Sequence, residues 1–127
     1  MPNPTAKRTL RPLSFAAPHV FVVAAVEGDD TTAVHRLVGT DTIFGRGAAA
    51  DVVVDDDLVS QRHLRLRVDG GVCTIIDLGS LNGTSLNGRP LRANVSQRLR
   101  HLDEFVVGNQ RFLVLSGKFR PTPPERG

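Results

Sequence analysis

A serine and a histidine lie three residues apart in the segment "LVSQRHL" (58–64), and this pair could do chemistry. A serine hydroxyl beside a histidine base is the nucleophile of many hydrolases. Such an enzyme also needs an orienting carboxylate, an oxyanion hole and a serine exposed on a strained turn. The residues around Ser60 are not Gly-x-Ser-x-Gly, and Asp77, which could supply the carboxylate, ends a predicted strand, where capping is more common. The sequence therefore argues against an enzyme.

Two other loops, "FGRG" (44–47) and "LGSLNGT" (78–84), are rich in residue types that bind ligands. The first is not a nucleotide-binding loop, because no Gly-Lys-Ser/Thr follows its glycines. The tetrapeptide "SLNG" occurs at 80–83 and again at 85–88, which is too short for a structural repeat. We interpret the second copy as a turn in which asparagine and glycine supply a positive φ. The first copy lies in the candidate loop 78–84, so its residues are candidates for ligand binding as well as for a turn.

Short β-branched runs between turn residues must position these loops. The segment "HLRLRV" (63–68) alternates strictly, so that its apolar residues share one face of a strand and its arginines the other. No segment keeps a 3.6-residue apolar period for ten residues, so almost no helix is expected. We predict an all-β sandwich or small barrel. The candidate strands are 20–26, 33–38, 42–46, 51–54, 63–68, 72–78, 104–108 and 111–115.

The chain has 127 residues, which suits one domain with its own core. Residues 1–17 are basic and contain several prolines, and we interpret them as a flexible tail. Residues 118–127, "KFRPTPPERG", have the composition of a proline-rich tail or linker. The folded domain is therefore expected over residues 18–117.

Composition argues against several classes of function. The net charge is +3, but the arginines are scattered and no tryptophan or tyrosine is present to stack on bases, which disfavours nucleic-acid binding. No apolar run approaches the roughly 18 residues of a membrane span. The single cysteine, Cys73, cannot form an internal disulfide or a zinc site and is expected to be a buried thiol. These features suit a cytoplasmic protein with no metal or cofactor.

The order and spacing of the three loops resemble the forkhead-associated (FHA) domain, a family that binds phosphothreonine peptides. The family pattern is Gly-Arg at a strand end, Ser-x-x-His about fifteen residues later, and then Ser-x-Asn-Gly-Thr. All three are present in this order, and the resemblance covers about residues 20–116. It implies a sandwich of two antiparallel sheets with about eleven strands and a ligand site in the loops at one end. The strands that the sequence does not reveal are expected in 84–102.

The resemblance implies three direct contacts with a phosphopeptide. Arg46 matches the phosphate-binding arginine of the family, and Ser60 matches the serine whose hydroxyl and backbone reach the phosphate. Asn82 matches the asparagine that hydrogen-bonds the ligand main chain beside the phosphothreonine. A phosphothreonine carries about −1.5 to −2 charges and three acceptor oxygens. The fork of a guanidinium can engage two of those oxygens at once.

Four further residues are implied to shape the loops. His63 matches a family histidine that transfers no proton and instead fixes the shape of the serine loop, "VSQRH" (59–63). Gly45 and Gly83 are expected to be needed for the backbone, and Thr84 for closing the loop. The resemblance therefore assigns the Ser60–His63 pair to binding and loop structure.

Gln61 and Leu81 depart from the family pattern. Gln61 stands where the family often has arginine, lysine or asparagine, and Leu81 stands where it often has a threonine that touches the phosphate. Arg62 is a nearby cation that could contribute. Losing one charge-assisted contact costs about 1.5–3 kcal/mol, so we expect phosphate binding that survives but is weakened. The alternative is a scaffold or oligomerisation domain on the same fold that binds an unphosphorylated partner.

The resemblance also implies the partners. These are a threonine-phosphorylated protein or peptide and the upstream Ser/Thr kinase. Leu58 and Val59, just before the serine, lie where the family selects flanking residues, and we expect a pocket for an aliphatic side chain with basic residues tolerated or preferred nearby. Thr5, Thr9 and Thr122 lie in the tails, and their phosphorylated forms could bind the site of the same or a neighbouring molecule.

Overall fold

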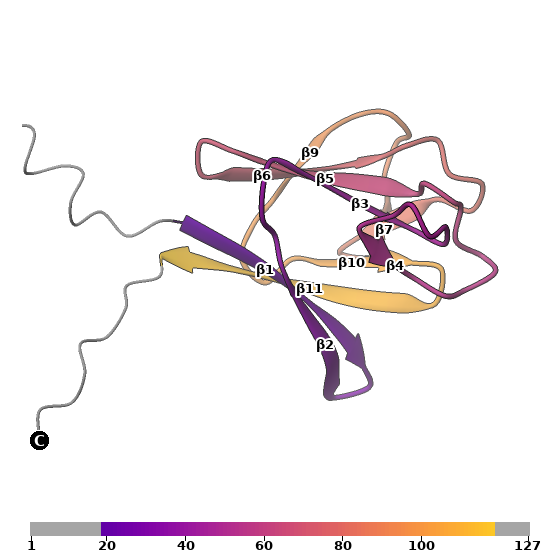
Figure 1. Ribbon diagram of the computed structural model, residues 1–127, viewed down its shortest axis with the longest axis horizontal. Helices are drawn as coiled ribbons and strands as arrows, with labels where there is room; N and C mark the ends of the chain where they lie inside the picture. The colour runs from indigo at the N-terminus through magenta and orange to yellow at the C-terminus, as the bar shows by residue number, and fades with distance from the viewer. Residues whose placement is uncertain (1–18, 119–127) are drawn as a thin grey trace, which may run out of the picture.

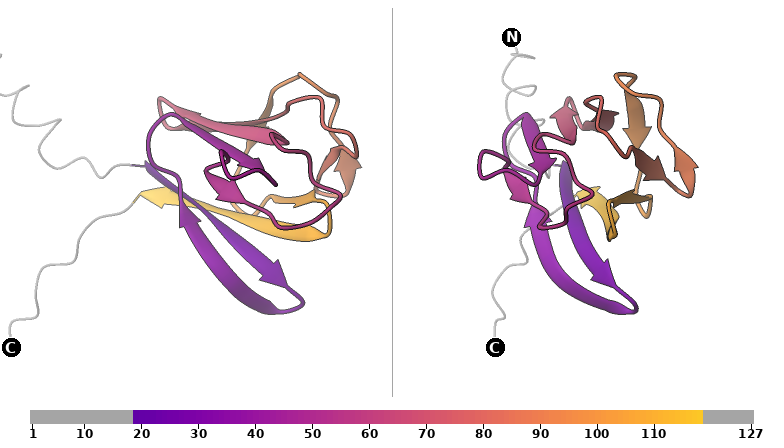
Figure 2. Two further views of the ribbon diagram at one scale, coloured as in Figure 1. Left: turned by 45° about the vertical axis from the view of Figure 1, so that its right-hand side comes forward. Right: turned by 90° about the vertical axis from the view of Figure 1, so that its right-hand side faces the viewer.

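The computed structural model of the protein describes residues 19–118, which form eleven strands and no helix (Figure 1). The strands build two sheets that pack as a sandwich (Figure 2), and the predicted all-β sandwich is therefore confirmed. The strands are β1 (His19–Glu27), β2 (Asp30–Arg36), β3 (Asp41–Gly45), β4 (Val52–Val53), β5 (Leu64–Asp69), β6 (Val72–Asp77), β7 (Thr84–Leu86), β8 (Arg89–Pro90), β9 (Gln97–Leu99), β10 (Glu104–Val107) and β11 (Gln110–Lys118).

The larger sheet has six strands in the order β2-β1-β11-β10-β7-β8, and the smaller has five in the order β4-β3-β5-β6-β9. Neighbouring strands are antiparallel, except that β4 runs parallel to β3. The long strands β1 and β11 pair from His19 opposite Lys118 to Val26 opposite Arg111. The first and last strands of the described chain therefore lie side by side in the larger sheet (Figure 1).

The alternating sequence of β5 shows why these residues form a sandwich. Leu64 and Leu66 are buried and Arg67 is exposed, because successive side chains of a strand point to opposite faces. The neighbouring strand β6 alternates in the same way, with Cys73 and Ile75 buried. The apolar inner faces of the two sheets together form the core.

Three phenylalanines from both sheets form the centre of the core. Phe44 is the next-to-last residue of β3 in the smaller sheet, and Phe105 and Phe112 lie in the larger sheet; all three are buried. Their ring centroids are 5.2–5.6 Å apart. Burying each side chain contributes about 1.5–3 kcal/mol. Because Phe44 directly precedes Gly45 and Arg46, the core also holds the strand end from which a candidate loop begins.

The region expected to hide short strands contains three. Strands β7, β8 and β9 all lie within 84–102, and β7 and β8 are joined by the second "SLNG" segment. In that turn Asn87 has a φ of 51° and Gly88 a φ of 82°. The prediction that the second copy is a turn with positive φ is therefore confirmed.

Three strands differ from the sequence prediction, and one of them, β11, covers Gln110–Lys118 instead of 111–115. The second strand covers Asp30–Arg36 instead of 33–38, because Gly28 adopts a φ of 63° in a tight turn and the chain pairs back onto β1 at once. Its first residues are polar and exposed, so no apolar pattern marks them. The strand predicted at 51–54 has ladder pairing only at Val52–Val53.

The predicted tails at 1–17 and 118–127 lie outside the described residues, apart from Lys118, which ends β11. Across residues 19–118, no helix is long and apolar enough to cross a membrane. In the same range, no three side chains of the metal-binding types come together. The candidate functional residues instead lie in loops at one end of the sandwich.

Candidate functional site

Three loops meet at the end of the sandwich away from the start of β1 (Figure 1). They are the segment after β3, the segment between β4 and β5, and the segment between β6 and β7. Antiparallel pairing of β3 with β5 and of β5 with β6 places these strand ends together. The structure therefore brings together the three clusters that the sequence singled out.

Arg46 is tied to the serine loop at two points. Its backbone N–H donates to the carbonyl of Ser60 at 2.9 Å, and its side-chain Nε donates to the carbonyl of Val59 at 2.9 Å. Its two terminal nitrogens make no hydrogen bond or ion pair with any other residue in 19–118. The side chain is exposed. Nε thus fixes the guanidinium while the rest of its fork faces solvent.

Gly45 allows the close approach of the strand to the serine loop. A Cβ atom at this position would lie 2.0 Å from the carbonyl oxygen of Gln61 and 2.7 Å from its carbonyl carbon. Neither backbone atom could move without separating the two loops. Only glycine therefore permits the observed spacing between Arg46 and Ser60.

The hydroxyl of Ser60 keeps its proton available. Ser60 Oγ accepts a hydrogen bond from the backbone N–H of Leu81 at 3.1 Å, which links the serine loop to the loop after β6. Because that bond uses a lone pair of Oγ, the O–H is left to donate to a ligand. The backbone N–H of Ser60 donates to Nδ1 of His63 at 3.0 Å.

His63 is fully buried, and both of its ring nitrogens are in use. Nδ1 accepts from the Ser60 N–H, so the neutral ring carries its proton on Nε2, which lies 2.8 Å from the Gly83 carbonyl and donates to it. In this arrangement neither nitrogen is free to accept the Ser60 hydroxyl proton. The histidine joins the serine loop to the loop after β6.

Asp77 is a buried carboxylate that holds the loop after β6 in shape. One oxygen accepts from the backbone N–H groups of Gly79 and Ser80, at 2.9 and 2.8 Å. The other accepts from the hydroxyls of Ser80 and Thr84, both at 2.6 Å. Burial raises the pKa of Asp77, but these hydrogen bonds together outweigh burial and hold its pKa below the usual value.

Asn82 lies on the rim of the site and is exposed. Its Nδ2 donates to the carbonyl of Leu58 at 2.9 Å, so its amide is fixed against the serine loop. The amide oxygen and the second N–H have no partner among residues 19–118 and can meet a peptide main chain. The next residue, Gly83, adopts a φ of 81° and turns the chain after Asn82.

The three other residues predicted to contact the ligand, Gln61, Arg62 and Leu81, all lie on the surface. Gln61 and Arg62 are exposed, and the Gln61 side chain lies so close to Gly47 that a Cβ there would be 2.1 Å from its Oε1. The Leu81 side chain is 88% exposed. Gln61 and Arg62 directly follow Ser60, and the Leu81 backbone bonds to the Ser60 hydroxyl, but contact of these three side chains with a phosphate stays a prediction.

Leu58 and Val59, which we call the specificity loop, expose one side chain to a ligand instead of the two predicted. Leu58 is 46% exposed, whereas Val59 is 1% exposed and packs in the core. The Val59 side chain lies against Gly108, where a Cβ would come within 2.8 Å of it. Val59 therefore contributes its backbone carbonyl to Arg46 and no side chain to a ligand.

Asp56 is a structural residue of the site that the sequence analysis did not single out. Its two carboxylate oxygens accept from the backbone N–H groups of Leu58 and Asn109, at 2.9 and 2.8 Å. These bonds lower its pKa. The bond to the residue two positions ahead is an Asx-turn, for which aspartate is a known signal. Three consecutive aspartates at 55–57 hide which one makes it.

The comparisons with known sequences point to one family. A sequence model described as the FHA domain matches residues 42–108. The glycogen accumulation regulator GarA of Mycolicibacterium smegmatis is 40% identical over 76 residues, 60% of this chain and 46% of the relative. The oxoglutarate dehydrogenase inhibitor of Corynebacterium glutamicum is also 40% identical over 76 residues, 60% of this chain and 51% of the relative. The chain thus spans about half the length of the curated relatives it matches, which are named as a regulator and an inhibitor.

The comparisons with solved structures agree. An FHA domain from a study of phosphothreonine-dependent FHA domain interactions is 29% identical with a TM-score of 0.67, over 81% of this chain and 99% of that one. The FhaA FHA domain, solved in complex with the intracellular domain of a second protein, is 31% identical with a TM-score of 0.66, over 74% of this chain and 98% of that one. The sandwich, the order of the three loops and these matches lead to one conclusion. The chain belongs to the FHA domain family.

Proposed function

We propose that this chain is a phosphothreonine-peptide-binding module that docks onto proteins phosphorylated by a Ser/Thr kinase. The observation that carries the proposal is the pairing of Arg46 with Ser60. A backbone bond joins the two residues, Arg46 Nε is fixed on the neighbouring Val59 carbonyl, and each side chain keeps a donor free. A phosphate dianion needs that combination of a fixed cation and a neutral donor.

The surrounding loops complete the role. The exposed Arg62 adds positive charge near the site, and the fixed amide of Asn82 suits the ligand main chain. Hydrogen bonds from charged groups contribute about 1.5–3 kcal/mol each. Two structural relatives support the assignment, since one comes from a study of phosphothreonine-dependent interactions and the other is a complex with a protein domain.

The proposal includes the absence of catalysis. Both nitrogens of His63 are occupied and Asp77 is saturated by loop hydrogen bonds, so neither can act as the base for Ser60 within residues 19–118. The names of the curated relatives, a regulator and an inhibitor, support a signalling role. A cytoplasmic location belongs to the proposal and rests on the sequence alone. A Ser60-dependent turnover of an activated ester would overturn this part of the proposal.

A shallow groove beside the site supports a choice of flanking residue. It has a volume of about 280 Å³, and its lining includes Leu58, Asn82, Pro90 and Val106. The apolar side chains among them suit an aliphatic residue of the ligand. We expect Leu58, as the exposed member of the specificity loop, to contact that residue.

Self-association through a phosphorylated tail remains part of the proposal. Thr5, Thr9 and Thr122 lie outside the described residues, so only their place in the sequence supports it. Mass spectrometry of kinase-treated protein would identify a modified threonine. Gel filtration before and after treatment would then show whether dimers form.

A fluorescence anisotropy titration with three degenerate peptide libraries tests the function. The libraries share their flanks and carry phosphothreonine, phosphoserine or threonine at the centre. We expect the wild-type protein to bind the phosphothreonine library far more tightly than the other two, and Arg46→Ala to abolish the difference. Arg98→Ala is the matched control, since Arg98 is exposed on β9 and its side chain makes no hydrogen bond or ion pair within residues 19–118.

Equal binding of phosphorylated and plain libraries by the wild-type protein would contradict the proposal. That result would instead support the phosphate-blind scaffold on the same fold. The structure does not favour this alternative, because the terminal nitrogens of Arg46 have no partner in the described chain and face solvent.

A further inference from the structure

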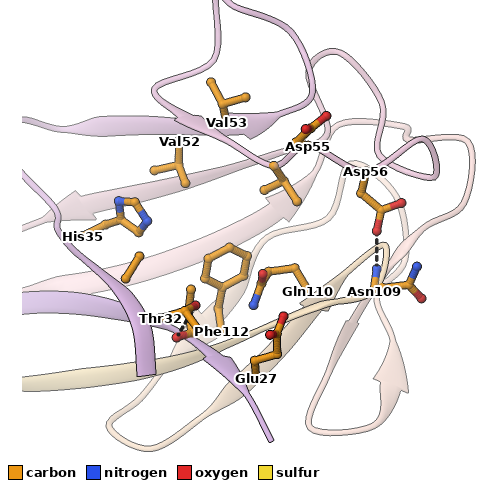
Figure 3. A pocket seen from close by; sticks show the side chains of 13 residues that line it. Glu27, Thr32, His35, Val52, Val53, Asp55, Asp56, Asn109, Gln110 and Phe112 are labelled. Atoms are coloured by element: carbon orange, nitrogen blue, oxygen red, sulfur yellow. Dashed lines mark hydrogen bonds between the residues drawn. The ribbon is translucent and has the colours of Figure 1, made fainter. Parts of the chain in front are cut away.

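A second concave surface, which we call the side groove, lies between the edge strands of the two sheets. Figure 3 shows it between β2, the edge of the larger sheet, and β4, the edge of the smaller one. Its volume is about 460 Å³. Its floor is apolar and is built by Ala25, Val52, Val54 and Phe112.

Carboxylates line the side groove. Glu27 lies at the end of β1 and Asp55 in the loop after β4, and Figure 3 shows these two lining residues on opposite sides of the groove. Neither side chain makes a hydrogen bond or ion pair with a residue in 19–118. Asp56 is the third, and its lowered pKa keeps it ionised while it holds its loop. Among the lining residues, His35 is the one side chain that could carry positive charge.

The side groove adjoins the strand end that leads to Arg46. The backbone N–H of Val54 donates to the carbonyl of Gly45 at 2.9 Å, so the groove wall touches the residue that precedes Arg46. Asp55 and Ser60 lie in the same loop, residues 54–63 between β4 and β5. One loop thus carries both an acidic residue of the groove and the hydroxyl of the proposed phosphate site.

We propose that the side groove binds a lysine- or arginine-containing extended segment of the same partner that supplies the phosphothreonine. The inference rests on the proposed function and names the substrate class more closely: a phosphothreonine with basic residues nearby in the sequence. Lysine and arginine suit this surface because their stems pack on an apolar floor while their charged ends reach the carboxylates. The edge strands β2 and β4 also present backbone groups to which an extended chain can bond.

The distance between the two sites fits a short peptide. Neighbouring strands lie about 4.8 Å apart and an extended chain advances about 3.3 Å per residue. Asp55 follows Val54, which is bonded across to Gly45, so the near wall of the groove lies within about 10 Å of the Arg46 backbone. A residue three to five positions from the phosphothreonine reaches about 10–17 Å. Residues at those positions can reach the part of the groove between Asp55 and Glu27.

The test compares peptides that share one phosphothreonine core. Three sets carry alanine, lysine or glutamate at positions three to five from the phosphothreonine, on either its N-terminal or its C-terminal side. Each is titrated by fluorescence anisotropy at low and high salt against wild type and Glu27→Gln/Asp55→Asn. Asp69→Asn is the control, because Asp69 is an exposed acid at the β5–β6 turn, the end of those strands away from the phosphate site.

We expect the lysine peptide on one side of the core to bind wild type about 3- to 10-fold more tightly than the alanine peptide, as two or three exposed charge pairs predict. High salt and the double variant should both remove this gain, whereas Asp69→Asn should keep it. The alanine peptide should bind all three proteins equally. If the lysine peptide keeps its tighter binding in the double variant, or shows none in wild type, the proposal for the side groove is wrong but the proposed function stands. No binding of any phosphopeptide refutes the proposed function, and the side groove with it.

Discussion

Replacing Asp77 by asparagine tests whether the hydrogen bonds of this buried carboxylate build the ligand loops. Asparagine keeps one oxygen for the N–H groups of Gly79 and Ser80. It places an NH₂ group where the second oxygen accepted from the hydroxyls of Ser80 and Thr84 at 2.6 Å. Two bonds to a charged group contribute about 1.5–3 kcal/mol each. Because the hydroxyls can rotate to accept instead, we expect a loss of about 2–4 kcal/mol in the free energy of unfolding.

Urea denaturation at several pH values measures this loss. With an m-value of about 2 kcal/mol/M, the urea midpoint at pH 7 should fall by about 1–2 M. The pKa of Asp77 is lower in the folded protein than in the unfolded chain. Its contribution is therefore fully present above the unfolded value of about 3.9 and disappears as the pH falls through the folded value. The gap between wild type and Asp77→Asn should thus narrow below about pH 4.

Asp69→Asn is the control for this experiment, since it removes an exposed aspartate and should shift stability by less than about 0.5 kcal/mol. If Asp77→Asn is no less stable than Asp69→Asn at pH 7, the carboxylate does not build the loops. A gap that stays constant down to pH 3 would refute the assigned origin of its lowered pKa.

Three further changes have expected outcomes. Gly45→Ala introduces a Cβ 2.0 Å from the Gln61 carbonyl oxygen, so it should lower stability by about 1–3 kcal/mol in urea denaturation and weaken phosphopeptide binding at least 10-fold in anisotropy. Unchanged affinity would show that the loop spacing is not needed. Leu81→Thr replaces a side chain that is 88% exposed, so it should leave stability unchanged and tighten phosphothreonine binding by up to about 10-fold through a new hydroxyl donor. Weaker binding would place Leu81 itself against the ligand. Burial raises the pKa of Cys73 to about 11, so its thiol should resist alkylation at pH 8 until urea unfolds the protein, and rapid labelling of folded protein would contradict that burial.

Local patterns in the sequence were sufficient to predict the sandwich and the order of its ligand loops. The strict alternation of 63–68 indicates a strand with one buried face, and Asn87-Gly88 indicates a turn with two positive φ values. Both signals are short-range and appear directly in residue types. The start of β2 gave no such signal, because Asp30 and the threonines after it lie exposed on an edge strand.

Contacts between distant segments could not be predicted in the same way. The roles of the His63 nitrogens depend on Ser60 and on Gly83, twenty residues away, and only the packed loops show which tautomer is present. Val59 looks like a surface residue beside Leu58, but its packing against Gly108 depends on how the β10–β11 turn meets the serine loop. The side groove likewise exists only because the edges of two sheets come together.

A two-dimensional NMR titration tests the central claim most directly, because it locates the phosphate on the protein. Labelled protein is titrated with one phosphothreonine peptide and with its unphosphorylated twin. We predict the largest shifts at the Arg46 side-chain Nε and at the amides of Gln61, Arg62 and Leu81, and no comparable shifts with the plain peptide. Shifts centred elsewhere on the sandwich, or identical shifts with both peptides, would contradict the account.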